Sequence, residues 1–476
     1  MADHRSLFAR SGLALTVFLM PVRSVAAQGC AVLDPLAAPT AAWTSTWARS
    51  FGGASYDYPN DILPLADGGS VVVGYSASVG QGTDAWAMQL DRSGTPVWQK
   101  SYGSSAWDEW RDIAAMPAGG YIAVGNTKSY GAGDYDVWVV RLSANGDILW
   151  QRAYGGNAAD FAAIAVPTSS GFYVIGTTAS ATTGWTRLWV IKLDDAGGIS
   201  WQKVYGGSEY ASDAVAAADG GLWVVEQSGT SGGFLSTVLL RLDPAGNVLW
   251  QKAYVGDNNS IFTPTSLSLT IDGGAVIAGY AGTYPSNIYD AWVLKVNGSG
   301  DVQWQYTFGG AEDDWAKAIV PFGSEGYRLV GYTKSYGSNG QDVWVLSLNA
   351  TGSLVRQVAL GGPGNEDAYG GAALAPDYSL LVGGYTGSFS AGSNDAWILK
   401  LSPEGLPGAD CGLSTTTTAV GVSGVAAAHV STLPTASATL GSVATSSAAT
   451  DIALTAATQC QGAELAPVLF LPALQH

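Results

Sequence analysis

The stretch Trp98-Gln99-Lys100-Ser101-Tyr102-Gly103 belongs to a pattern that the chain repeats over most of its length. Most copies place a Trp first, a Gln second, and an aromatic residue four positions after the Trp, followed by Gly. The successive spacings are 51, 52, 51, 49, 54 and 52 residues, because the first position of the copies falls at Trp47, Trp98, Trp150, Trp201, Trp250, Trp304 and Arg356. Such a fixed period indicates an array of equivalent structural units.

Each period contains three further short segments. In the second period these are Asp112–Met116, Tyr121–Gly125 and Asp136–Leu142, which are rich in β-branched and aromatic residues and bounded by Gly, Asn and Asp. This composition predicts β-strands. A turn such as Asp91–Gly94 joins the third strand to the Trp strand, with Gly supplying the positive φ of a tight hairpin. Four strands in about 51 residues are typical of one β-propeller blade.

The two ends of the array each hold part of one blade. Trp43–Phe51 is a Trp strand without three strands before it, and Asp395–Leu401 is a third strand without a Trp strand after it. We therefore predict an all-β, seven-bladed β-propeller of four-stranded blades in which the N-terminal strand completes blade seven. Closing the ring removes unpaired sheet edges. The alternative is an open β-solenoid, whose coils are usually shorter. The recurring Trp residues are interpreted as packing anchors between blades.

The composition limits the partners. The 476 residues include 21 Lys+Arg and 38 Asp+Glu, a formal charge of −17. An acidic chain repels phosphate backbones and anionic lipids, so nucleic acid and polybasic membrane docking are not expected. No run is apolar for long enough to predict a membrane span.

The first residues resemble an export signal. Arg5 and Arg10 precede the apolar run Gly12–Val22, and small residues follow at Val25–Ala27. We expect a secreted, periplasmic or cell-surface protein with a signal peptide at 1–27, a linker at 28–42, the propeller at 43–410 and a Ser/Thr/Ala-rich tail at 411–476. The tail is predicted to be extended, packed on the propeller rim, or partly disordered. A lipoprotein ending its signal at Gly29-Cys30 is the alternative.

Histidine limits the chemistry of the repeats. The three His residues, His4, His429 and His476, all lie outside the repeats, as do all three Cys residues. The repeats therefore contain no Ser-His-Asp triad and no imidazole or thiolate ligand for a metal ion.

Carboxylates beside aromatic rings are the remaining candidates. They follow the Gly that ends each Trp segment, and they would form a ring at one mouth of the central channel if they precede the innermost strands. Aromatic faces with acceptor oxygens suit sugars, or a hard cation such as Ca²⁺, although no Asp-x-Asp-x-Asp-Gly loop occurs and no cofactor is expected. The alternative is that each carboxylate caps its own turn. The candidate binding residues are Asp57, Tyr58, Asp108, Trp110, Asp160, Phe161, Asp313, Asp314, Trp315, Asp367 and Tyr369, and Asp213 and Glu366 were placed in the same repeat position.

Residues 43–405 resemble secreted bacterial and archaeal repeat proteins predicted to form β-propellers, whose copies read WQKTYGG, DGGYIVVGYT and DVWVLKLD. The resemblance implies the fold and little about activity. The Asp-x-x-Gly-x-x-x-Trp element is also similar to the repeat of quinoprotein dehydrogenases, whose turn carries a Thr-Gly-Lys that this chain lacks. The resemblance extends to a tail bracketed by two Cys and implies a Cys411–Cys460 disulfide. A Cys30–Cys411 pair is the alternative, and export permits either.

The sequence thus favours a secreted, non-enzymatic module that binds an extracellular glycan or protein. One alternative is a glycosidase that uses two carboxylates as acid and base, and another is a quinone-dependent oxidoreductase. The carboxylates considered for the glycosidase are Asp108, Glu109, Asp313, Asp314, Glu366 and Asp367.

Overall fold

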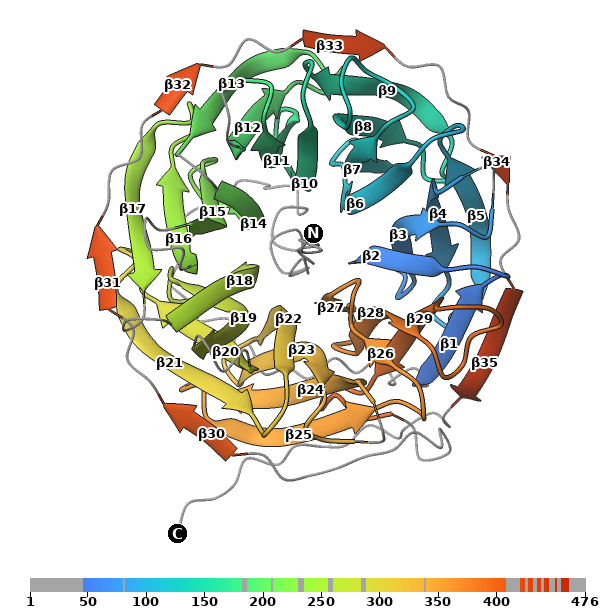
Figure 1. Ribbon diagram of the computed structural model, residues 1–476, viewed down its shortest axis with the longest axis vertical. Coiled ribbons are helices and arrows are strands. Elements are labelled where there is room, and N and C mark those ends of the chain that lie inside the picture. The colour runs from blue at the N-terminus through green and yellow to red at the C-terminus, as the bar shows by residue number, and fades with distance from the viewer. Residues whose placement is uncertain are drawn as a thin grey trace, which may run out of the picture.

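The structure is a computed structural model. It describes residues 46–407, apart from 80–81, 182–185, 207–208, 230–234, 256–259, 284–287 and 338–339, and six short tail segments, 420–423, 427–430, 435–437, 441–444, 450–451 and 455–461. Within this part of the chain all regular structure is β, in seven antiparallel sheets arranged as a ring (Figure 1). The predicted seven-bladed β-propeller is confirmed.

Blades one to six each contain four consecutive strands. The first strand of each lies nearest the centre of the ring, and the fourth lies farthest from it (Figure 1). Blades one and two contain β2 (Asp57–Pro64), β3 (Ser70–Ser76), β4 (Asp84–Leu90), β5 (Pro96–Tyr102), β6 (Asp108–Ala115), β7 (Tyr121–Thr127), β8 (Asp136–Leu142) and β9 (Ile148–Gly155). Blades three and four contain β10 (Asp160–Pro167), β11 (Phe172–Thr178), β12 (Arg187–Leu193), β13 (Ile199–Tyr205), β14 (Glu209–Ala216), β15 (Leu222–Gly229), β16 (Leu235–Leu242) and β17 (Val248–Val255). Blades five and six contain β18 (Ser260–Leu269), β19 (Ala275–Thr283), β20 (Tyr289–Val296), β21 (Val302–Gly309), β22 (Asp314–Phe322), β23 (Gly326–Thr333), β24 (Asp342–Asn349) and β25 (Leu354–Leu360).

Blade seven joins the two ends of the array. Its inner part is β26 (Glu366–Asp367) and β27 (Ala372–Leu374), followed by β28 (Leu380–Thr386) and β29 (Asp395–Leu401). The N-terminal β1 (Trp47–Gly52) pairs antiparallel with β29, with Phe51 opposite Ala396 and Trp47 opposite Lys400. The predicted closure of the ring by the first strand is confirmed.

The repeated Trp, Gln and Tyr residues hold neighbouring strands and blades together. In blade two, the buried Trp138 donates its indole N–H to Gln151 Oε1 at 3.1 Å. Tyr154 donates its hydroxyl to the carbonyl of Gly197, in the turn of blade three, at 2.6 Å. Gly197 has a φ of 78°, and the Trp150 ring fills the space beside its Cα. The motif therefore encodes both blade formation and blade-to-blade contact.

The inner strands of blades one to six each carry a β-bulge. In three of these blades a buried Asp just after the bulge accepts a backbone N–H from the inner strand of the next blade. Ile113 donates to Asp61 at 3.1 Å, and Ala165 donates to Asp112 at 2.7 Å. The sequence grouped Asp213 with the carboxylates that precede the inner strands. It lies instead just after the bulge of β14, where it accepts the N–H of Leu267 at 2.7 Å.

The tail runs around the outside of the ring. Its described segments pair antiparallel with the outermost strands of blades five, four, three, two, one and seven, in that order (Figure 1). They are β30 (Val420–Ser423), β31 (Ala427–Val430), β32 (Thr435–Ser437), β33 (Gly441–Ala444), β34 (Thr450–Asp451) and β35 (Thr455–Gln461). Of the arrangements expected for the tail, these segments show the extended one on the rim.

Several sequence predictions concern residues outside the described part. These are the signal peptide at 1–27, the linker at 28–42, Cys30 and Cys411. Cys460 lies on β35, where its backbone is opposite Ala48. The disulfide and the export of the chain therefore stay predictions. Within the described ranges, no helix is long and apolar enough to cross a membrane.

Candidate functional site at the centre of the propeller

The carboxylates at the start of the inner strands are held inside the fold. Asp108 is fully buried and accepts three hydrogen bonds, from the backbone N–H of Ser104 at 2.9 Å and from the hydroxyls of Thr127 at 2.5 Å and Ser129 at 2.6 Å. The same arrangement of a loop N–H with one or two hydroxyl donors recurs at four more buried carboxylates, Asp57, Asp160, Asp314 and Glu366.

These contacts are those of a turn cap, the second role that the sequence allows for this position. Burial raises the pKa of Asp57 and Asp108 above the ordinary value, even though the hydrogen bonds to each act in the opposite direction. Their predicted contact with a ligand is not tested by these contacts and stays a prediction.

The five candidate rings separate into three places. Trp110 is fully buried in the core, stacked on Trp138 at 4.2 Å between ring centroids. Tyr58 and Tyr369 pack against each other at 5.7 Å, in a cluster that joins blades one and seven. Phe161 and Trp315 line a cavity at the centre of the propeller.

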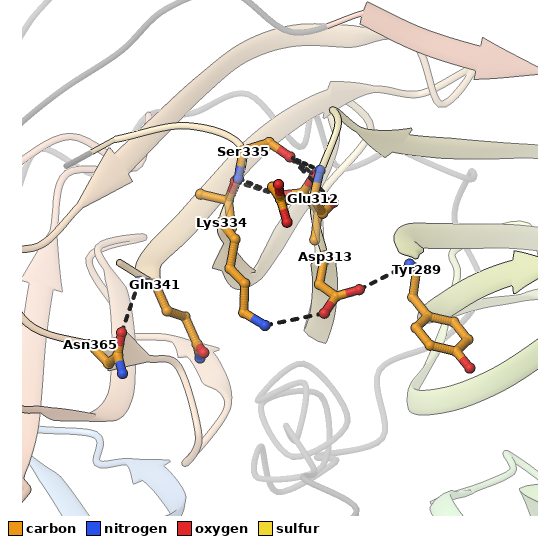
Figure 2. A network of polar contacts seen from close by, with 9 residues as sticks. Tyr289, Glu312, Asp313, Lys334, Ser335, Gln341 and Asn365 are labelled. Carbon is orange, nitrogen blue, oxygen red and sulfur yellow. Dashed lines mark hydrogen bonds and ion pairs between the residues drawn. The ribbon is translucent and has the colours of Figure 1, made fainter. Parts of the chain in front are cut away.

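Asp313 lies in the loop that precedes β22 and links two blades. Figure 2 shows its carboxylate between Lys334 and Tyr289. Lys334 Nζ lies 3.1 Å from Asp313 Oδ2, and the backbone N–H of Tyr289 in blade five donates to Asp313 Oδ1 at 3.2 Å. A second loop contact in the same view joins blades six and seven, where the N–H of Gln341 donates to Asn365 Oδ1 at 3.1 Å.

The central cavity has a volume of about 340 Å³. It lies between the inner strands of blades two to six, and its lining combines aromatic rings, neutral polar groups and two cations. The lining contains no carboxylate among the described residues. The lining side chains include the rings of Phe161, Tyr210, Tyr280 and Trp315, the amides of Asn126 and Gln227, and the cations Arg111 and Lys317.

Lys317 joins the aromatic wall to blade seven. It is the bulged residue of β22, almost fully buried, with its Nζ 3.7 Å from Asp367 Oδ2. The same Nζ lies 5.0 Å from the centroid of the Trp315 ring, and that ring also stacks on Tyr280 at 3.9 Å between centroids. Burial raises the pKa of Asp367, and the charge of Lys317 opposes that rise. Asp367 and Trp315, both candidates, are thus brought together through Lys317.

Arg111 is held by a chain of polar contacts. It is the bulged residue of β6, and its guanidinium lies 3.0 Å from Glu109 Oε1. Glu109 also accepts the side-chain N–H of Asn126 at 2.8 Å, and Asn126 Oδ1 accepts the backbone N–H of Ala162 at 2.8 Å. The chain of contacts fixes Arg111 and Asn126 at the cavity wall.

Six of these lining side chains were missed by the sequence predictions, namely Arg111, Lys317, Asn126, Gln227, Tyr210 and Tyr280. A signal for the two cations exists, because each follows the first carboxylate of its inner strand, Asp108 or Asp314, by three residues. Tyr210 occupies the second position of β14, as Phe161 does in β10 and Trp315 in β22. Tyr280 lies on the second strand of blade five, where nothing in the repeat distinguishes it.

The described residues contain no group of three or more His, Cys, Asp or Glu side chains that could hold a metal ion. Most of the carboxylates that the sequence suggested for Ca²⁺ lie in the turns of different blades, where loop N–H and hydroxyl groups bind them. Asp313 and Asp367 are instead paired with Lys334 and Lys317.

Comparison with known proteins gives structural likeness alone. No family model and none of the curated proteins match the sequence. Among solved structures, Sqt1 from Chaetomium thermophilum is 12% identical, with 75% of this chain and 87% of that chain covered and a TM-score of 0.40.

Two further solved structures show a similar level of likeness. A subtype N11 neuraminidase-like protein of A/flat-faced bat/Peru/033/2010 (H18N11) is 13% identical over 62% of this chain and 88% of that chain, with a TM-score of 0.38. The Trypanosoma rangeli sialidase in complex with the inhibitor DANA is 11% identical over 74% of this chain and 56% of that chain, with a TM-score of 0.33. Activity cannot be carried over at such distances.

Proposed function

We propose that this chain is an extracellular or cell-surface binding module that takes a glycan unit into the central cavity. The observation that carries the proposal is the composition of the lining, in which aromatic rings from several blades meet amide, hydroxyl and cationic groups. Rings offer apolar area to the C–H face of a sugar, and a few polar groups set its orientation. The volume of about 340 Å³ suits a small ligand better than a protein surface.

The charges around the cavity support binding over hydrolysis. A glycosidase of the usual type places one carboxylic acid and one carboxylate on either side of the scissile bond. In this chain the carboxylates that contact the two lining cations, Glu109 and Asp367, are ion-paired with Arg111 and Lys317. Asp108, Asp314 and Glu366 cap turns. The export of the chain, which an extracellular ligand requires, rests on the pattern of residues 1–27.

A glycan array followed by calorimetry on the full chain tests the proposal. Phe161→Ala removes a ring of the lining that is only partly buried, so we expect folding to be preserved and affinity to fall about ten-fold, which corresponds to about 1.4 kcal/mol. Val97→Ala, an exposed apolar residue of the outer strand β5, is the matched control and should bind as the unchanged protein does.

Two results would contradict the proposal. One is the absence of binding to any glycan by the unchanged protein, and the other is equal affinity of Phe161→Ala and Val97→Ala. Release of new reducing ends from a bound glycan would instead favour the glycosidase.

A further inference from the structure

The tail keeps one register around the propeller. In each outer strand that it pairs with, we consider the residue just before the aromatic residue near the end of the strand. From blade five round to blade seven these residues are Thr307, Ala253, Val204, Ala153, Ser101 and Ser50, and their partners are Val422, His429, Ala436, Val443, Thr450 and Ala457. Each partner lies seven positions after the one before. The tail therefore advances by one heptad per blade.

Each heptad supplies a segment that pairs with one blade and a link to the next blade. Seven extended residues span at most about 23 Å at roughly 3.3 Å each, which is enough for a short paired segment and a link to the next blade. The tail residues opposite the outer-strand aromatic rings are all small, namely Gly421, Ala428, Thr435, Ser442 and Ala456. The pairing register of the tail thus repeats in phase with the propeller.

Blade six is the exception. Among the described residues its outer strand β25 pairs with β24 alone. An unpaired strand edge presents free N–H and C=O groups and invites association with other chains. The described chain stops at Pro407 on blade seven and resumes at Val420 on blade five, so residues 408–419 connect blades on either side of blade six.

We propose that residues 413–416 supply the fifth strand of blade six. One heptad before Val422 is Thr415, and the position in β25 that corresponds to Thr307 is Ala359, so the register places Thr415 opposite Ala359. The segment then runs antiparallel to β25, as the six described tail strands do to their partners. The tail becomes a belt of seven heptads that covers the outer edge of every blade.

Hydrogen exchange of the β25 amides in the full chain tests this assignment. The variant Ser414→Pro/Thr415→Pro removes two adjacent N–H groups, one of which must face β25 because successive N–H groups of a strand point to opposite sides. The matched control Thr417→Pro/Thr418→Pro changes the following positions, which correspond to residues between the described tail strands. Thermal unfolding shows whether both variants keep the propeller.

We expect the outward-facing amides of β25 to be protected in the unchanged protein, to exchange at least ten-fold faster in Ser414→Pro/Thr415→Pro, and to be unaffected in the control. The proposal fails if these amides exchange as an open edge does in the unchanged protein, or if both double variants exchange alike. It also fails if protection appears only at concentrations where the protein has the mass of a dimer, because a second copy would then cover β25.

Discussion

Two of the Gly residues that follow an outer-strand aromatic residue, Gly309 and Gly155, are required by the two carboxylates beside them. At Gly309, a Cβ would overlap Asp290 Oδ1 and lie 3.0 Å from Asp314 Oδ2. At Gly155, Asp136 and Asp160 take the same two places. Any other residue would displace the carboxylates that cap the neighbouring turns. The Gly is therefore needed for the space beside its Cα, since neither of these two has a positive φ.

Asp290 makes folding stability depend on pH. Burial, followed by the charges of Asp314 and Asp313, raises its pKa from 3.8 to about 6. The folded protein thus holds this proton more tightly than the unfolded chain, so the contribution to stability is complete below about pH 4 and is lost as the pH rises through 6. A shift of about two units corresponds to at most about 3 kcal/mol, and solvent around this half-buried group reduces it.

When the pH is lowered from 7 to 5, the free energy of unfolding should rise less in Asp290→Asn than in the unchanged protein. We expect a difference of about 1 kcal/mol or more. Urea unfolding at the two pH values measures the difference, and carboxylates distant from Asp290 contribute equally to both proteins. Asp147→Asn is the control, because its carboxylate is paired with Lys100 and its pKa is lowered. Identical pH profiles for Asp290→Asn and the unchanged protein would contradict the assignment.

At the scale of the strand, the inner bulges decide how blades are joined. The bulge shifts the register, and the carboxylate after it reaches the backbone of the next inner strand. Asp112→Ala deletes the acceptor for the buried N–H of Ala165, so we expect a loss of about 1–3 kcal/mol in the free energy of unfolding. Asp112→Asn keeps a carbonyl oxygen and should recover most of it. Equal destabilisation in the two variants would show that this hydrogen bond is not the cause.

The bulges also explain which elements could be predicted from the sequence. The second and third strands and the turns were correct because their alternation and Gly positions are regular. The inner strand of blade two was placed at Asp112–Met116, whereas β6 begins at Asp108, because the bulge buries Asp108 and Asp112 and hides the alternation. For the same reason Arg111 and Lys317 were not recognised as cavity residues. The individual tail strands were not predicted, because a run of Ser, Thr and Ala shows no alternation of apolar and polar residues. The strands with which the tail pairs belong to the blades and are distant in the sequence.

At the scale of the whole molecule, the heptad register gives the Cys411–Cys460 prediction a physical basis. The two residues are 49 positions apart, which is seven heptads and one circuit of seven blades. Cys460 lies on blade seven, and Cys411 follows Pro407 of blade seven by four residues. We expect a disulfide that closes the belt, formed when the two thiols give up two electrons and two protons to a disulfide-bearing oxidant.

Peptide mapping without reduction should find residues 411 and 460 in one linked peptide, with Cys30 free. Cys460→Ser should then lower the free energy of unfolding by about 2–4 kcal/mol, and Cys30→Ser should leave it unchanged. A linked peptide containing residues 30 and 411 would contradict this pairing and support the alternative.

The overall architecture was predictable because the incomplete units at the two ends add up to one blade, which requires a closed ring. The central cavity was not predictable, since it is made by residues of five blades whose side chains meet only after the ring has closed. The repeat position of Trp315, Phe161 and Asp367 was enough to predict them as candidate site residues. Their surroundings in the folded protein could not be predicted from that position.

β1 is the first strand that the structure describes, but the strands that pair with it are synthesised much later. β1 ends at Gly52, yet its two pairing strands are β29, which begins at Asp395, and β35, which begins at Thr455. A product truncated before Asp395 therefore keeps both sides of β1 bare, in addition to the incomplete ring. Such fragments should be rapidly degraded or form aggregates, so a complete ring forms only after the chain has been synthesised through β29 and β35.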